Sequence, residues 1–138
     1  MKKSLYPFVV VALALGVSAG IAASPVAAAP VASFTASTPT PHVGDQVTFD
    51  ASASVCDTAV CSYQFTLSWT GTNHATHTIT TLYGPVASYT FAPVDATYPY
   101  GVTMLVKVTN STRTHAYGTA QQSFVVAPAP PPVPPPLT

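Results

Sequence analysis

Apolar and polar residues alternate along several stretches of this sequence. The clearest is residues 102–109, where apolar side chains fall at every second position: Val102, Met104, Val106 and Val108. Residues 47–51 and 122–126 repeat this period. A period of two is typical of a strand with one face buried and the other in water. Helical spacing of apolar residues is not sustained after residue 30, so the pattern predicts β structure.

Turn-forming Gly, Pro and Asn-Ser pairs divide this region into short segments. We expect seven strands, at residues 31–37, 46–53, 62–70, 76–82, 87–91, 102–109 and 116–126. About seven short strands separated by turns predict an all-β sandwich of two sheets, formed by residues 30–126.

The two ends of the chain have a different composition. Lys2 and Lys3 precede an apolar run at residues 8–23 and then small residues, which predicts a secretory signal peptide at residues 1–28. The alternative is an uncleaved membrane anchor, although the run is shorter than the roughly 20 residues of a spanning helix. With the signal removed, we expect no stable membrane insertion.

Residues 127–138 read APAPPPVPPPLT, with seven prolines. Proline lacks the N–H that strands and helices use, so this segment is predicted to be a polyproline II linker. A ligand for a proline-binding domain is the alternative.

Charged residues are only 6% of the chain, with four Lys or Arg and four Asp or Glu. Nucleic-acid binding depends on dense positive charge, so this composition excludes it as the function. Thr, Ser, Asn and Gln are expected to supply most of the polar surface.

Residues 30–37 and 43–54 resemble the start of a polycystic-kidney-disease (PKD) domain, above all through Val-Thr-Phe-Asp-Ala-Ser-Ala-Ser at 47–54. Residues 62–65, 88–91 and 104–110 resemble later strands of that family. The resemblance implies an immunoglobulin-like sandwich with an extracellular interaction or spacer role and no catalysis. Residues 65–70 depart from it, because Phe-Thr-Leu-Ser-Trp-Thr replaces the family's Trp-Asp-Phe-Gly-Asp-Gly turn. Any cation chemistry of that turn is therefore not transferred.

Cys56 and Cys61 lie five positions apart, directly after the Asp-Ala-Ser-Ala-Ser segment. Two cysteines so close in an exported chain predict a disulfide. A zinc site would need two further ligands at matching spacing, and the sequence has none.

The histidines and acids do not predict a catalytic, metal or cofactor site. His74 and His77 are three apart in a Thr-rich segment, and residues three apart on a strand point to opposite faces. His42 and His115 need only solvated roles. Asp45 lies in the turn before the predicted strand at 46–53, and Asp50 lies in the Phe-Asp-Ala-Ser segment of that strand. Carboxylates beside turns commonly accept backbone hydrogen bonds. No Gly-x-Ser-x-Gly nucleophile turn is present, so we expect no enzyme activity.

Aromatic residues on strands or adjoining loops are the best candidates for ligand contact, because exposed rings stack on sugars or fill a partner's pocket. They are Trp69, Tyr83, Tyr89, Tyr98 and Tyr100. Tyr98 and Tyr100 are expected to form an exposed pair, and Trp69 is either a core residue or a contact. Leu105 falls on the wet face of its strand, either under a loop or in a contact patch. These features predict a secreted non-catalytic module that binds an extracellular protein or a polysaccharide, or acts as a spacer. The alternative is a structural subunit that self-associates through sandwich edges.

Overall fold

The computed structural model describes residues 28–57, 60–110 and 113–137, with no side-chain description for 113–115. The predicted signal peptide therefore lies, apart from Ala28, outside the described residues. The described part forms these elements: β1 (Thr35–Ala36), β2 (Gln46–Asp50), β3 (Cys61–Thr70), β4 (Thr76–Tyr83), β5 (Val86–Thr90), the 3-10 helix η1 (Pro93–Thr97), β6 (Val102–Asn110) and β7 (Arg113–Phe124).

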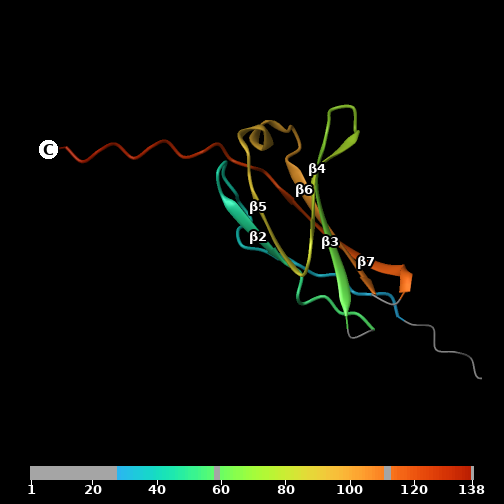
Figure 1. Cartoon of the computed structure of the whole chain (residues 1–138). Helices are drawn as coiled ribbons and strands as arrows, with labels where there is room; N and C mark the ends of the chain where they lie inside the picture. The colour runs from blue at the N-terminus through green and yellow to red at the C-terminus, as the bar shows by residue number, and fades with distance from the viewer. Residues whose placement is uncertain (1–27, 58–59, 111–112, 138) are drawn as a thin grey trace, which may run out of the picture.

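The strands form two antiparallel sheets that face each other (Figure 1). One sheet has the order β1-β2-β5, and the other has the order β4-β3-β6-β7. The predicted all-β, immunoglobulin-like sandwich of two sheets is confirmed. Because β3 and β6 are the central strands of the larger sheet, both faces of that sheet are built mainly around them.

The first predicted strand, at residues 31–37, is the one that differs most. Only Thr35–Ala36 pairs with β2, whereas Val31 forms a separate antiparallel bridge with Val55. The Val31 N–H donates to the Val55 carbonyl at 2.8 Å. The segment therefore changes partner along its length, which a period-two pattern does not reveal.

The second predicted strand, at residues 46–53, ends early at Asp50. An Asp50 carboxylate oxygen accepts the Ser52 N–H at 2.9 Å, and the Ser54 N–H donates to the Ala51 carbonyl at 2.9 Å. These bonds turn the chain away from the sheet. Hydrogen bonds from the Ser52 side chain and backbone lower the pKa of Asp50. The predicted backbone-bonding role of this carboxylate is confirmed.

A 3-10 helix, η1, occupies a place where the sequence predicted only a turn. Asp95 is only 1% exposed. Its Oδ2 atom accepts hydrogen bonds from the Ala92 N–H at 2.8 Å and from the Tyr89 hydroxyl at 3.1 Å. Burial, together with this hydrogen bond to Asp95, raises the pKa of Tyr89 to about 12. The buried carboxylate therefore ties η1 to β5.

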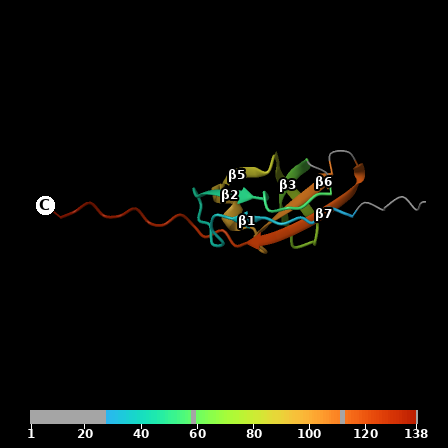
Figure 2. The same ribbon diagram turned by 90° about the horizontal axis from the view of Figure 1, so that it is seen from below.

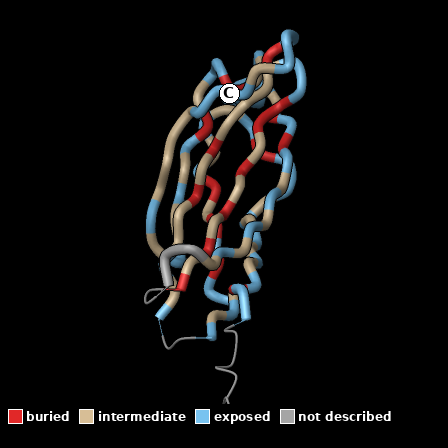
Figure 3. The backbone as a smooth tube through the Cα atoms, turned by 90° about the vertical axis from the view of Figure 1, so that its right-hand side faces the viewer, coloured by how far each residue is buried: buried red, intermediate tan, exposed pale blue. Residues whose placement is uncertain are grey.

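The core lies between the two sheets (Figure 3). Its buried apolar residues are Val47, Phe49, Ala51, Phe65, Leu67, Phe91, Val102, Met104, Val106, Val108, Phe124 and Val126. The predicted inward face of the 102–109 strand is confirmed, because its four alternating apolar residues are all 0% exposed. The residues that alternate with them, Thr103, Leu105, Lys107 and Thr109, are half-buried and point away from the core.

The Cys56–Cys61 disulfide is present, as predicted. It closes a loop of six residues, so the chain-entropy contribution is small, about 2 kcal/mol. We expect a Cys56→Ser/Cys61→Ser variant to fold and to lose about that free energy of unfolding, since neither cysteine is among the fully buried core residues. Urea denaturation measures the loss. Complete unfolding of the double variant would contradict the modest contribution.

Two backbone hydrogen bonds hold the start of the Pro-rich tail against the β1–β2 loop. The Val43 N–H donates to the Ala127 carbonyl at 2.8 Å, and the Ala127 N–H donates to the Pro41 carbonyl at 2.9 Å. Beyond this point residues 128–137 are exposed and extended, and they lead away from the sandwich (Figures 1 and 2). The described chain begins at the opposite end of the sandwich (Figures 1 and 2).

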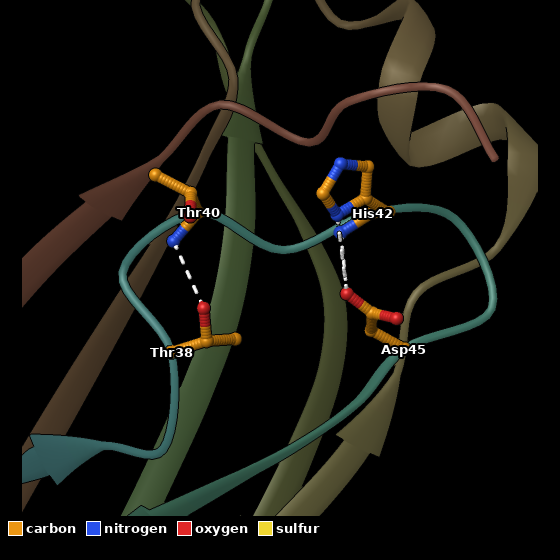
Figure 4. Close-up of polar contacts among 4 residues, drawn as sticks. All are labelled: Thr38, Thr40, His42 and Asp45. Carbon is orange, nitrogen blue, oxygen red and sulfur yellow. Dashed lines mark hydrogen bonds and ion pairs between the residues drawn. The ribbon is translucent and has the colours of Figure 1, made fainter. Parts of the chain in front are cut away.

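The loop that holds the tail is itself stiffened by short-range polar contacts (Figure 4). The Thr40 N–H donates to Thr38 Oγ1 at 3.3 Å, and the His42 N–H donates to Asp45 Oδ2 at 2.8 Å. The His42 Nδ1 atom lies 3.5 Å from the same Asp45 oxygen. The expected backbone-bonding role of Asp45 is confirmed, and it fixes the loop against which the tail begins.

Candidate functional site

The outward-facing side of the four-stranded sheet carries polar side chains on all four strands. Strand alternation and register identify the residues on this side, because cross-strand partners share a face. We call it the outer face: Thr76, Thr78, Thr81 and Tyr83 of β4; Gln64, Thr66, Ser68 and Thr70 of β3; Thr103, Leu105, Lys107 and Thr109 of β6; and Tyr117, Thr119, Gln121 and Ser123 of β7.

Two exposed tyrosines lie on the outer face, one on each of its edge strands. Tyr83 of β4 is 73% exposed and Tyr117 of β7 is 53% exposed. Three strand spacings separate their strands, which corresponds to roughly 14 Å. Both lie toward the end of the sheet where β3 begins, since Tyr83 pairs with Gln64 and Tyr117 with Thr109. They present large ring surfaces on either side of the two central strands.

A shallow groove of about 310 Å³ lies further along the same face. It is lined by Ser68, Thr70, Thr76, Thr103, Leu105 and Gln121. The Thr103 and Ser123 hydroxyls lie 3.0 Å apart and form a hydrogen bond across β6 and β7. The groove therefore combines one apolar side chain with hydroxyl and amide groups that both donate and accept hydrogen bonds.

Lys107 occupies the centre of the outer face, between Gln64 on β3 and Thr119 on β7. Its ammonium lies 4.5 Å from the centroid of the Tyr117 ring, in a cation–π contact. Such contacts at exposed sites contribute about 0.5–1 kcal/mol. The contact orders the ammonium on one side of the tyrosine.

Trp69, a sequence candidate for ligand contact, lies in a stack of three rings. The indole is 4.5 Å from the His77 ring and 4.6 Å from the Tyr98 ring, centroid to centroid. His77 and Tyr98 come from β4 and from the segment after η1, and they cover the two faces of the indole. A sugar ring can stack on Trp69 only if one of these partners moves away. Its role as a ligand contact stays a prediction.

Tyr98 and Tyr100 do not form the exposed pair that the sequence predicted. Tyr98 is half-buried because it stacks on Trp69, and burial and the nearby Asp95 charge raise its pKa. Tyr100 is 59% exposed, but it lies in the loop before β6 and not on the outer face. The alternation of Tyr and Pro in this loop did not show that one ring turns inward.

Leu105 lies where the strand pattern placed it, on the outward side of β6. It is half-buried and lines the groove, with Thr66 and Gln121 as its cross-strand partners. The groove that it lines is formed by side chains of the same face, which fits a contact patch. It is therefore the one residue singled out from the sequence that the structure places on the outer face.

Tyr117 was missed as a site candidate, whereas Tyr83 was among the aromatic residues considered for ligand contact but was not singled out. A signal for each was present in the sequence, since Tyr83 follows the inward-facing Leu82, and Tyr117 lies one strand period before Thr119 on a polar face. What the sequence lacked was the order of the strands. Only the sheet topology shows that β4 and β7 are the two edges of one face.

His74 and His77 have separate surroundings. His74 lies in the β3–β4 turn with a φ of 61°, whereas His77 is on β4 and stacks on Trp69. Within residues 28–57, 60–110 and 113–137, no group of three or more His, Cys, Asp or Glu side chains is placed to hold a metal ion. In the same described ranges no helix is long and apolar enough to cross a membrane.

Comparison with known proteins relates the chain to a fold and not to a family. No protein-family model matches the sequence, and no curated protein matches it. One solved structure with a similar fold comes from work on the structural basis for the promiscuous specificity of carbohydrate-binding modules from the beta-sandwich super family. The TM-score is 0.51 at 24% identity, over 76% of this chain and 37% of that one. This likeness supports the sandwich architecture.

Proposed function

We propose that this protein is an exported, non-catalytic module that binds polysaccharide on the outer face of its four-stranded sheet. The observation that carries the proposal is the composition of that face. Two exposed tyrosines lie on either side of hydroxyl and amide side chains, and a groove lies further along the same face. The carbohydrate-binding module with a similar fold adds support.

The chemistry of the outer face suits a sugar chain. Sugars present C–H faces that pack on aromatic rings and hydroxyls that exchange hydrogen bonds with Thr, Ser and Gln side chains. Eight residues of β3 separate the level of Tyr117 from the end of the groove at Thr70, which corresponds to roughly 27 Å. A face of this length accommodates several sugar units lying along the strands.

Export and the spacer role complete the proposal. The N-terminal signal pattern and the Cys56–Cys61 disulfide both fit an oxidising extracellular environment. The tail is held at its root by Val43 and Pro41, and at about 3.1 Å per residue its exposed part reaches roughly 31 Å. It would keep the binding face at a distance from whatever the tail is joined to. The PKD resemblance fits the same extracellular role.

Binding to a panel of soluble polysaccharides, measured by retardation in affinity gels and by calorimetry, tests the proposal. We expect Tyr83→Ala and Tyr117→Ala each to weaken binding to the retained polymers by about 10-fold, since exposed aromatic anchors commonly contribute 1–2 kcal/mol or more. Tyr100→Ala is the matched control, because it removes an equally exposed tyrosine outside the outer face.

Two results would contradict the proposal. Failure of the purified protein to bind any polysaccharide in the panel would remove the function. Loss of binding in Tyr100→Ala, with Tyr83→Ala and Tyr117→Ala unaffected, would indicate that the ligand binds at the loop before β6 instead. Urea denaturation of each variant separates lost contact from lost folding.

Self-association through sandwich edges is the alternative function. Edge strand β4 carries no Lys, Asp, Glu or Pro, which leaves it open to pairing with another strand. A bulge interrupts the β4 register opposite Leu67 and Ser68, and bulges hinder edge pairing. Sedimentation across a wide concentration range would separate the two functions, because a monomer at every concentration contradicts assembly.

A further inference from the structure

Charge is distributed unevenly over the sandwich. Lys107, at the centre of the outer face, is the one lysine or arginine whose side chain the structure describes. The chain has four carboxylate side chains, and none lies on that face. Asp45 lies in the β1–β2 loop, Asp50 on β2 of the other sheet, Asp57 in the disulfide loop, and Asp95 is buried beside η1.

The surroundings of Lys107 leave its charge available to a ligand. Its described contact is with the Tyr117 ring, at 4.5 Å, and the ion pair formed within the described ranges joins His42 to Asp45 instead. Gln64 and Thr119 flank Lys107 with neutral groups. An ammonium held on an aromatic ring, without a carboxylate partner, keeps its donors for an incoming anion.

The position of the ammonium matters as much as its charge. Lys107 shares a cross-strand row with Tyr83 and Gln64, and it lies beside Tyr117. A sugar ring packed on Tyr117 would therefore place its substituents near the ammonium, whereas Tyr83 lies two strand spacings, roughly 10 Å, away. A carboxylate there would form an ion pair with the ammonium, whereas a neutral ester in the same place could only accept a hydrogen bond from it.

We propose that the outer face selects acidic polysaccharides, with Lys107 recognising the carboxylate of a uronic acid unit. This inference rests on the proposed polysaccharide-binding function and adds a substrate class and a specificity residue to it. The anion pairs with the Lys107 ammonium while the tyrosines pack on the sugar rings. Because the ion pair is half-exposed, the preference is expected to weaken as salt is added.

The test compares polygalacturonate and alginate with the methyl-esterified form of each, which keeps the backbone and removes the charge. We expect the protein to bind at least one acid form about 3-fold to 5-fold more tightly than its ester, because the ester lacks only the ion-pair attraction of a half-exposed site. Lys107→Gln should bind both forms with the affinity of the ester. Lys107→Arg should retain the preference.

Three results would overturn the inference, and the first two leave the proposed function standing. Equal binding of acid and ester forms by the protein would contradict the preference for acidic polysaccharides. The proposed function would still stand if the protein were retained on neutral polymers. An equal loss of both forms in Lys107→Gln makes Lys107 a structural residue only. Failure to bind any polymer contradicts both proposals. The urea midpoint of Lys107→Gln should match that of the parent protein, which shows that folding is unchanged.

Discussion

Replacing Phe49 with Ala is expected to cost about 3–5 kcal/mol of the free energy of unfolding, the range for deleting a buried ring. Phe49 is 0% exposed and contacts three other rings, those of Phe34, Phe65 and Phe124, at centroid separations of 6.3, 6.2 and 5.9 Å. These rings come from both sheets, so the cavity would lie at the junction of the layers. Urea denaturation measures the loss.

Gln46→Ala is the matched control for Phe49→Ala, because Gln46 lies on the same strand but is exposed. Its effect should stay within about 0.5 kcal/mol. If Phe49→Ala does not fold, Phe49→Leu keeps most of the volume and should lose about 1.5 kcal/mol or less. A Phe49→Ala loss no larger than that of Gln46→Ala would contradict the central position of this ring.

The second large effect is expected for Gly101→Ala, at about 2–5 kcal/mol. Gly101 has a φ of 70°, and the left-handed region costs other residues about 1–2 kcal/mol. An added Cβ would also overlap the Phe124 carbonyl oxygen. Since Phe124 pairs with Val102 at the start of β6, relieving the overlap would shift the β6–β7 ladder, at an overpacking cost of about 1–3 kcal/mol.

Two other glycines separate these contributions. Gly44 has a φ of 91° with open space around the added Cβ, so Gly44→Ala should show the backbone strain alone, about 1–2 kcal/mol. Gly118 does not have a positive φ, but its Cβ would overlap the Pro30 carbonyl oxygen, so Gly118→Ala should show the overlap alone. Equal losses in Gly44→Ala and Gly101→Ala, measured by urea denaturation, would show that the Phe124 contact carries no cost.

The outer-face proposal depends both on the alternation pattern of the sequence and on contacts that only the folded chain makes. Leu105 could be placed on the wet side of its strand from the alternation alone, because a side chain's face follows from its position in the period. Tyr98 could not be placed in this way, because it lies in a loop where no period applies. Its inward turn results from stacking on Trp69, a contact between residues 29 positions apart that only the folded chain brings together.

The sequence by itself determined the class of fold, six of the seven strands to within a few residues, the inward face of β6 and the Cys56–Cys61 pair. These depend on local rules: the period of the side chains, the residues that form turns, and the short distance between two cysteines. Only the tertiary structure decided that Tyr83, Lys107 and Tyr117 share one surface. β3–β4 and β6–β7 are pairs of consecutive strands, so the order of this sheet is decided by the long-range pairing of β3 with β6, which no local pattern encodes.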